Sequence, residues 1–180
     1  HNIQPAYRKI TIKNWGVKMK IPVTLNDSKI VLEAAPSENL MTVLRREKLF
    51  SVKCGCARGL CGNCSVLLNG KPVSSCTIPV GTIRDSRIET LEHIKNSPYY
   101  QDIITGFNQA GIHLCGFCNT GKILTAYNLL KNYNRPTTEQ IYGELNNYSI
   151  CCTSTENLAC GIMYAIAQKH FREGKQHGSK

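Results

Sequence analysis

The sequence predicts an α+β protein in which a small β-sheet holding one helix is followed by a four-helix bundle. In residues 17–90, apolar and polar residues alternate in short runs separated by turn residues, which is typical of strands. After about residue 90 the apolar residues recur every three to four positions, which is typical of amphipathic helices. We therefore expect an N-terminal extension over 1–16, a sheet domain over 17–90, a helical domain over 91–173 and a polar tail over 174–180.

The first elements expected are a hairpin and a helix. Every second residue from Val17 to Leu25 is apolar, which predicts a half-buried strand. Residues 26–28 predict a turn, and residues 30–32 predict the returning strand. A helix is expected to follow, with Ser37 as its N-cap and an apolar face within residues 40–44.

A second hairpin is expected after a cysteine-rich loop. Residues 65–68 predict a strand, Asn69-Gly70 is a strong turn signal, and residues 73–76 predict the returning strand. Two hairpins and one helix together indicate a small sheet that grips a helix, which is the β-grasp arrangement of plant-type ferredoxins.

Four helices are expected in the second half of the chain. Their apolar stripes lie within residues 99–107, 123–130, 141–145 and 158–166. Thr137 with Gln140, and Thr153 with Glu156, have the spacing of capping boxes at the starts of the third and fourth helices. Short connections between the helices favour a bundle.

The cysteines of the first half carry the strongest functional signal. They have the spacing C-x4-C-x2-C followed by a distal cysteine, and they are Cys56, Cys61, Cys64 and Cys76. This is the spacing with which plant-type ferredoxins bind a 2Fe–2S cluster through four thiolates, two on each iron. Gly59 and Gly62 allow the backbone of the loop to approach the cluster closely, and Gly55 is placed to do the same. The sequence therefore predicts one-electron transfer.

The cysteines allow two other interpretations. Ten cysteines are enough for a disulfide framework, but a chain of 180 residues can build its own core, and its cysteines are bunched in tight loops. The two C-x2-C pairs, Cys61 with Cys64 and Cys115 with Cys118, also suit zinc. A zinc site, however, does not account for three cysteines on one loop with a distal fourth.

A second group of cysteines lies in the predicted helical domain. Cys115 and Cys118 fall between the first two helices, Cys151 and Cys152 precede the last helix, and Cys160 lies inside it. Cysteines at two neighbouring helix junctions can form a second cluster site, and helix N-termini favour its negative charge.

Composition narrows the choice of partners. The formal net charge is +10, but the basic residues are scattered, with one small cluster at Arg45, Arg46 and Lys48, and no RNA-reading aromatic motif is present. A solvated surface, or a basic face that docks on acidic partner subunits, is therefore favoured over nucleic-acid binding. No apolar membrane-spanning run or signal peptide is visible, and we expect a cytoplasmic protein without membrane contact.

The chain resembles the iron–sulfur (2Fe–2S) small subunits of the molybdenum hydroxylases, a family that includes xanthine dehydrogenases, aldehyde oxidoreductases and quinoline or nicotinate hydroxylases. The resemblance extends from about residue 17 to about residue 170. It is carried by Ser51-Val52-Lys53, Cys61-Gly62-Asn63-Cys64-Ser65-Val66, Ser75-Cys76, Thr90-Leu91-Glu92 and Cys115-Gly116-Phe117-Cys118.

The resemblance implies an oxidoreductase subunit that relays electrons. In that family, two 2Fe–2S clusters accept electrons from a molybdopterin centre on a large subunit and pass them to FAD, commonly on a third, medium subunit. It implies that the first cluster is bound by the first cysteine group and the second by Cys115, Cys118, Cys151 and Cys152. Substrate hydroxylation would take place on the partner, and no catalytic residue is expected in this chain.

The second cysteine group departs from the family pattern. Where the family usually has Cys-Arg-Cys-Thr-Gly-Tyr, this chain has Ile150-Cys151-Cys152-Thr153-Ser154-Thr155. Aligned on the threonine, Cys152 keeps a ligand position, Ile150 takes the other, and Cys151 is one residue out of register, so Cys160 is an alternative ligand. The glutamine that contacts the pterin in the family is replaced by Leu114. These departures leave a second hypothesis open, a stand-alone carrier with the N-terminal cluster only, and a less favoured third, a zinc-binding interaction protein.

Overall fold

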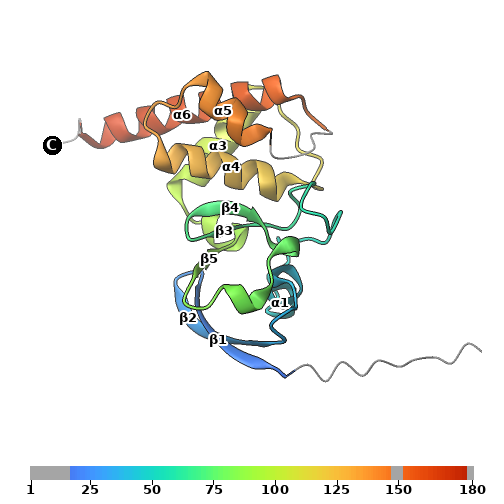
Figure 1. Ribbon diagram of the computed structural model, residues 1–180. Coiled ribbons are helices and arrows are strands. Elements are labelled where there is room, and N and C mark those ends of the chain that lie inside the picture. Colours follow the sequence, from blue (N-terminus) through green and yellow to red (C-terminus); the bar gives the residue numbers. More distant parts are fainter. Residues whose placement is uncertain (1–16, 147–151, 178–180) are drawn as a thin grey trace, which may run out of the picture.

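The computed structural model describes residues 17–146 and 152–177. The β-sheet and helix α1 form one layer, and the later helices form a second layer against it (Figure 1). The α+β class expected from the sequence is confirmed. The predicted extension over 1–16 lies outside the described residues, as do Ile150 and Cys151 of the second cysteine group.

Five strands form one sheet in the order β2-β1-β5-β3-β4. They are β1 (Met19–Leu25), β2 (Ser28–Ala34), β3 (Ser65–Leu68), β4 (Lys71–Ser74) and β5 (Arg87–Glu89). β1 and β5 pair in parallel, and the other neighbours pair antiparallel. The predicted first strand is confirmed from Met19 onward, but Val17 is 85% exposed and lies outside the strand, because the pairing with β2 ends at Met19.

Helix α1 (Leu40–Arg46) begins later than the sequence suggested. Asn39, and not Ser37, is the N-cap, and its side chain accepts a hydrogen bond from the backbone N–H of Thr42 at 2.8 Å. The predicted apolar face is confirmed, since Leu40, Val43 and Leu44 are buried.

The second hairpin positions the last cysteine of the first group. β3 and the Asn69-Gly70 turn agree with the prediction, and both turn residues have positive φ. β4 ends at Ser74, so Cys76 lies in the short 3-10 helix η1 (Ser75–Thr77) and not in a strand. A second 3-10 helix, η2 (Val80–Thr82), leads back toward β5.

The helical layer contains the four predicted helices and one short additional helix. Their bounds are α2 (Leu91–Ile94), α3 (Pro98–Gln109), α4 (Asn119–Asn132), α5 (Thr138–Leu145) and α6 (Thr155–His177). The capping box of Thr137 and Gln140 is confirmed at α5. At α6 the hydroxyl of Ser154, one residue after the predicted Thr153, accepts a hydrogen bond from Asn157 N–H. Helix α6 continues to His177, so its last residues lie within the segment 174–180 that the sequence predicts as a polar tail.

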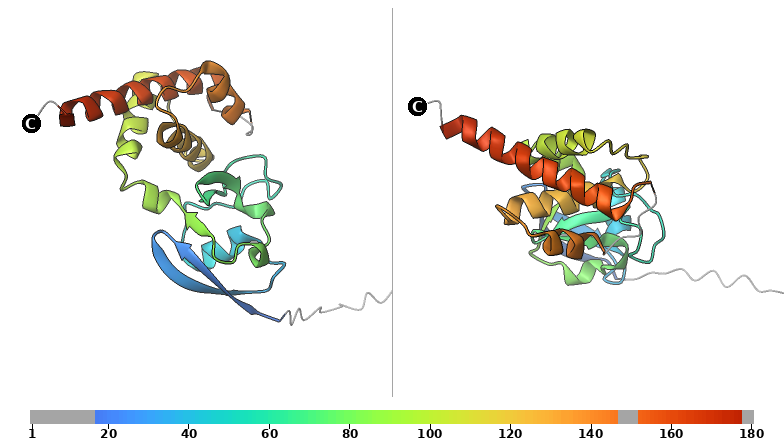
Figure 2. Two further views of the ribbon diagram at one scale, coloured as in Figure 1. Left: turned by 60° about the vertical axis from the view of Figure 1, so that its left-hand side comes forward. Right: turned by 90° about the horizontal axis from the view of Figure 1, so that it is seen from above.

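Two apolar cores hold the layers together. One lies between the sheet and α1 and includes Ile21, Leu32 and Leu44, and the other lies among the helices. Leu67 of β3 belongs to the helical core and α4 packs on β3 and β4, so the β3–β4 end of the sheet lies against the helices, as the side view in Figure 2 also shows. Each fully buried leucine contributes about 1.5–3 kcal/mol. No helix of the described residues has the length and apolar character needed to span a membrane.

Candidate metal centre

The first cysteine group lies on the loop between α1 and β3, closed by η1. The four thiols form two pairs: the Cys56 thiol is in hydrogen-bond contact with that of Cys61, and the Cys64 thiol with that of Cys76. The Cys56 backbone N–H also donates to Cys61 Sγ at 3.4 Å, and Ser75 ties η1 to the loop by donating from Oγ to the Cys64 carbonyl at 2.6 Å. The structure therefore brings all four predicted residues of the first group together on one loop and its closing turn.

Backbone N–H groups donate hydrogen bonds to the thiols of the Cys56–Cys61 pair. Arg58 N–H and Leu60 N–H donate to Cys56 Sγ at 3.4 and 3.3 Å. These hydrogen bonds, Arg58 first, lower the pKa of the Cys56 thiol to about 6, whereas burial raises the pKa of the Cys64 thiol to about 11. The loop therefore supplies hydrogen-bond donors that stabilise the thiolate form of Cys56.

Gly55 and Asn63 show how tightly the loop is built. A Cβ on Gly55 would lie 2.7 Å from Cys61 Sγ and 2.5 Å from Asn63 Nδ2. Asn63 is fully buried between two of the cysteines, and neither polar atom of its side-chain amide has a hydrogen-bond partner among the described residues. A buried amide is costly unless a polar group pairs with it, and cluster sulfur is an acceptor of the right kind.

The arrangement of the four thiols in two pairs indicates which kind of metal centre the first group can hold. Within the described residues, no three side chains of His, Cys, Asp or Glu converge on a position for a single metal ion. A 2Fe–2S cluster instead needs two thiolates at each of two irons, and the first group offers two pairs of thiols. None of the nine described cysteines is in a disulfide. The donor set of the first group therefore fits a two-iron cluster.

The second group gathers three of its predicted cysteines around the start of α4. The Cys152 thiol is in hydrogen-bond contact with Cys115, while Cys118 is the N-cap residue of α4. Cys118 is buried, and Cys115 and Cys152 are exposed. Cys160 lies in the second turn of α6 and is partly buried, and Cys151 lies outside the described residues.

A residue that the sequence analysis did not single out joins this group. Lys122 is buried, and its Nζ donates to Cys152 Sγ at 3.0 Å and also contacts the Cys118 thiol. Burial alone would lower the pKa of Lys122, but the hydrogen bonds to Cys152 and Cys118 outweigh it and raise the pKa. The same hydrogen bond from Lys122 lowers the pKa of Cys152 to about 7. The sequence signal that could have identified Lys122 is its i, i+4 spacing from Cys118, which places both side chains on one face of a helix.

The two cysteine groups lie against each other. Lys53 Nζ, from the first loop, donates to the Gly116 carbonyl at 2.6 Å, and Thr120 Oγ1 donates to the Ser51 carbonyl at 3.0 Å. A Cβ on Gly121 would lie only 2.9 Å from the Gly62 carbonyl oxygen. The first turn of α4 is therefore packed directly on the first cysteine loop.

Ser51 and Glu92 strengthen this junction. Both come from stretches that carry the family resemblance. Glu92 accepts hydrogen bonds from the Ser51 backbone N–H at 2.7 Å and from the Ser51 hydroxyl at 2.5 Å. Burial tends to raise the pKa of Glu92, but the hydrogen bonds from Ser51 and Thr90 outweigh it and lower the pKa.

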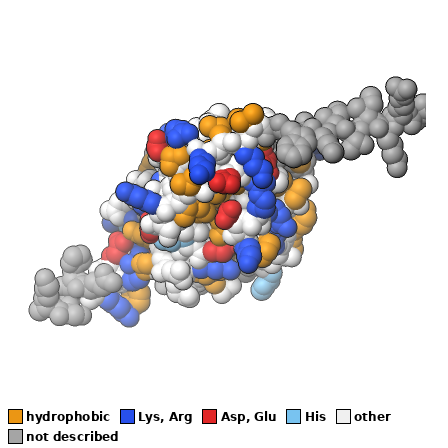
Figure 3. Space-filling model, turned by 90° about the horizontal axis from the view of Figure 1, so that it is seen from below, with side chains coloured by type: hydrophobic (Ala, Val, Ile, Leu, Met, Phe, Trp, Pro, Cys, Tyr) orange, Lys and Arg blue, Asp and Glu red, His pale blue; other side chains and the backbone are white. Residues whose placement is uncertain are grey.

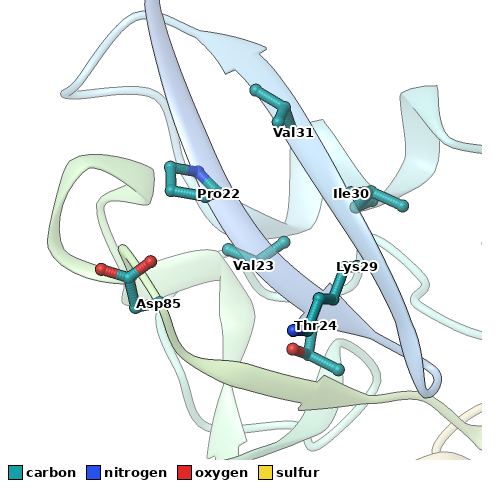
Figure 4. Close-up of a pocket in the computed structure, with 7 residues that line it drawn as sticks. All are labelled: Pro22, Val23, Thr24, Lys29, Ile30, Val31 and Asp85. Atoms are coloured by element: carbon teal, nitrogen blue, oxygen red, sulfur yellow. The ribbon is translucent and has the colours of Figure 1, made fainter.

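Other surface features lie away from the cysteines. A groove of about 400 Å³ on β1 and β2 is lined by residues such as Pro22, Ile30 and Asp85, none of which belongs to either cysteine group (Figure 4). On the face seen in Figure 3, Lys and Arg are mixed with Asp, Glu and hydrophobic side chains and form no continuous basic patch. This pattern agrees with the scattered charges of the sequence.

Comparison with known families gives two overlapping matches. Residues 12–110 match the model of the 2Fe-2S iron-sulfur cluster binding domain. Residues 90–163 match the model of the [2Fe-2S] binding domain. The first match contains all four cysteines of the first group, and the second match contains the second group.

Individual proteins give the same picture over most of the chain. The nicotinate dehydrogenase small FeS subunit of Eubacterium barkeri is 34% identical over 150 residues, which cover 83% of this chain and 96% of that protein. The xanthine dehydrogenase iron-sulfur-binding subunit of Escherichia coli O157:H7 is 32% identical over 126 residues, which cover 69% of this chain and 79% of that protein. A chain of quinoline 2-oxidoreductase from Pseudomonas putida 86 superposes with a TM-score of 0.72 at 28% identity, covering 85% of this chain and 97% of that chain.

Proposed function

The chain belongs to the family of iron–sulfur small subunits of the molybdenum hydroxylases, and from this premise we propose that it relays electrons through two 2Fe–2S clusters between two partner subunits. The donor would be a molybdopterin centre on a large subunit, and the acceptor would be FAD on a medium subunit. The role as an oxidoreductase subunit follows from the family.

The proposed fold has two domains. Residues 17–90 form a ferredoxin-like β-grasp domain, and residues 91–173 form a helical domain built around the bundle of α3, α4, α5 and α6. The separate apolar cores of the sheet and of the helices support this division.

The first cluster is proposed to be held by the first cysteine group. Cys56 and Cys61 would bind one iron, and Cys64 and Cys76 the other, because the thiols lie in those two pairs. This pairing, together with the backbone N–H groups aimed at Cys56, is the observation that carries the proposal. The cluster when bound supplies reversible one-electron transfer.

The second cluster is proposed to be held by Cys115, Cys118, Cys152 and Cys151. The contacts of Cys152 with Cys115 and, through Lys122, with Cys118 support the first three. Cys151 remains a prediction from the sequence. Cys160 is less well suited, since it lies inside α6 and not at the junction that precedes the helix.

The contacts between the groups suit a relay. The first loop and the start of α4 touch through Lys53, Thr120 and Gly121 without an intervening layer of side chains. We propose a cytoplasmic location, because the ligand thiols have to remain reduced until a cluster is bound. Substrate chemistry is assigned to the large subunit, and no residue of this chain is given a catalytic role.

The first site is tested by substituting one proposed ligand cysteine and one cysteine outside the ligand set. Cys61→Ser is expected to abolish or strongly perturb the first cluster's electron paramagnetic resonance (EPR) signal. Cys54→Ser is the matched control, since Cys54 is an exposed cysteine two residues before the ligand loop and is expected to leave the spectrum unchanged. An unchanged spectrum of Cys61→Ser would remove Cys61 from the ligand set.

Purification from the native host separates the relay from the stand-alone carrier. The family relatives are named as subunits of larger enzymes, which favours the relay. Co-purification with a large molybdenum-containing subunit is expected. A chain recovered alone from cells that make a complete molybdenum cofactor would favour the stand-alone carrier, and stoichiometric zinc without iron would favour the zinc-binding protein.

A further inference from the structure

Lys122 is a buried cation at the second cysteine group. It lies in the first turn of α4 and is 4% exposed. Its Nζ is 3.0 Å from Cys152 Sγ and is also in hydrogen-bond contact with the thiol of Cys118. The ammonium group therefore sits between two of the sulfur atoms assigned to the second cluster.

The partners of Lys122 are unusual for a buried lysine. A buried ammonium group is costly unless an anion or several acceptors surround it. Within residues 17–146 and 152–177, no salt bridge joins Lys122 to a carboxylate. By contrast, Lys169, which is also buried, donates to the carbonyls of Leu130 and Tyr133. Cysteine sulfur is thus the acceptor that the structure provides for Lys122, and thiolate sulfur is the form that balances its charge.

We propose that Lys122 is a positioning residue that balances the thiolate charge of the second site and raises the reduction potential of the cluster held there. This inference rests on the proposed function, because it requires the second cluster. Reduction adds one negative charge to a cluster, and a fixed cation beside its sulfur ligands stabilises the reduced form more than the oxidised form. Net charge and hydrogen bonds to sulfur are the factors by which proteins set such potentials.

The test compares Lys122→Met with a matched control on the same helix. Met has a similar length without the charge. Lys131→Met makes the same chemical change at the far end of α4, where Lys131 is exposed and its Nζ lies over the Tyr127 ring. Lys122→Arg keeps the charge. Each variant is reconstituted anaerobically and titrated potentiometrically by EPR, with the first cluster as an internal reference. The signal that Cys61→Ser removes belongs to the first site.

Lys122→Met is expected to lower the potential of the second cluster, so that at a fixed solution potential its reduced-to-oxidised ratio falls at least tenfold, equivalent to 59 mV for one electron. Lys131→Met and the first cluster are expected to stay unchanged, and Lys122→Arg to retain most of the wild-type potential. Loss of the second cluster in both Lys122→Met and Lys122→Gln, with retention in Lys122→Arg, would equally support the charge-balancing role.

Two different results would overturn the inference. If wild-type protein shows two signals and Lys122→Met leaves both potentials unchanged, the role of Lys122 is wrong and the relay stands. If wild-type protein forms only one cluster, the second-cluster assignment fails, and the inference about Lys122 fails with it.

Discussion

At the scale of single residues, Gly55 occupies a position in the first cysteine loop that has no room for a side chain. Its Cα faces Cys61 Sγ and the buried amide of Asn63, and a Cβ there would lie within 2.7 Å of both. Gly55→Ala is therefore expected to displace Cys61 and to weaken or remove the first cluster's EPR signal after reconstitution. Gly174→Ala is the control, because no described atom lies within 4 Å of a Cβ at Gly174 near the end of α6. A Gly55→Ala protein with a wild-type spectrum would show that the loop is not built as tightly as described.

Single residues also mark the limit of what the sequence predicts. The spacing of Cys56, Cys61 and Cys64 is local, and it was enough to expect a loop that gathers thiols. The position of Lys122 was not foreseen, because it becomes meaningful only when a distant segment packs beside it. For Lys122 that segment contains Cys152, thirty residues later in the chain.

Among the elements, the packing of α3 on α6 includes a largely buried ion pair. Arg172 of α6 donates from Nε and Nη2 to the carboxylate of Asp102 on α3, with a shortest distance of 2.8 Å. The Asp102 side chain is 7% exposed and that of Arg172 is 26% exposed. Removing one partner would leave the other charge largely buried and unpaired.

Arg172→Ala is expected to reduce the free energy of unfolding by about 3 kcal/mol, the lower end of the range for a broken buried pair. Arg46→Ala is the matched control, because Arg46 pairs with Glu38 at the surface and its loss should cost less than about 1 kcal/mol. Denaturant unfolding of both variants measures the difference. Equal losses would mean that Asp102 finds another partner or water.

Elements were predictable where their signals are local. The Asn69-Gly70 turn and the capping box of Thr137 and Gln140 involve only neighbours in sequence, and both agree with the prediction. The start of α1 was misplaced because Ser37 and Asn39 are both good N-caps. The packing of the chain decides between them: the Leu40 N–H donates to the Ile78 carbonyl in the neighbouring segment, which fixes the chain just before the helix.

At the scale of the whole molecule, Glu92 of α2 connects the helical layer to the loop that follows α1, through its hydrogen bonds with Ser51. Its pKa is lowered in the folded protein, since the effect of burial is exceeded by the hydrogen bonds from Ser51 and Thr90. A carboxyl group whose pKa is lower in the folded than in the unfolded protein stabilises the folded state at pH values above the unfolded pKa, which is about 4.3 for Glu. This stabilisation is lost as the pH falls through the pKa of the folded protein.

Wild-type protein is therefore expected to be more stable than Glu92→Gln at neutral pH, and this advantage should shrink below about pH 4. Thermal unfolding of the two proteins at matched pH values gives the comparison, and any acid loss of clusters affects both. An advantage that stays constant from neutral pH down to about pH 3 would contradict the role assigned to the Glu92 carboxylate.

The proposed relay requires that one chain carries two clusters, held by segments that pack against each other. The most direct measurement is the iron and acid-labile sulfide content of protein reconstituted without oxygen, together with its low-temperature EPR spectrum. The expected result is about four irons and four sulfides per chain and two distinct 2Fe–2S signals. About two irons with one signal would contradict it, since the helical site would then hold no cluster and the proposed relay to a molybdenum centre would be broken.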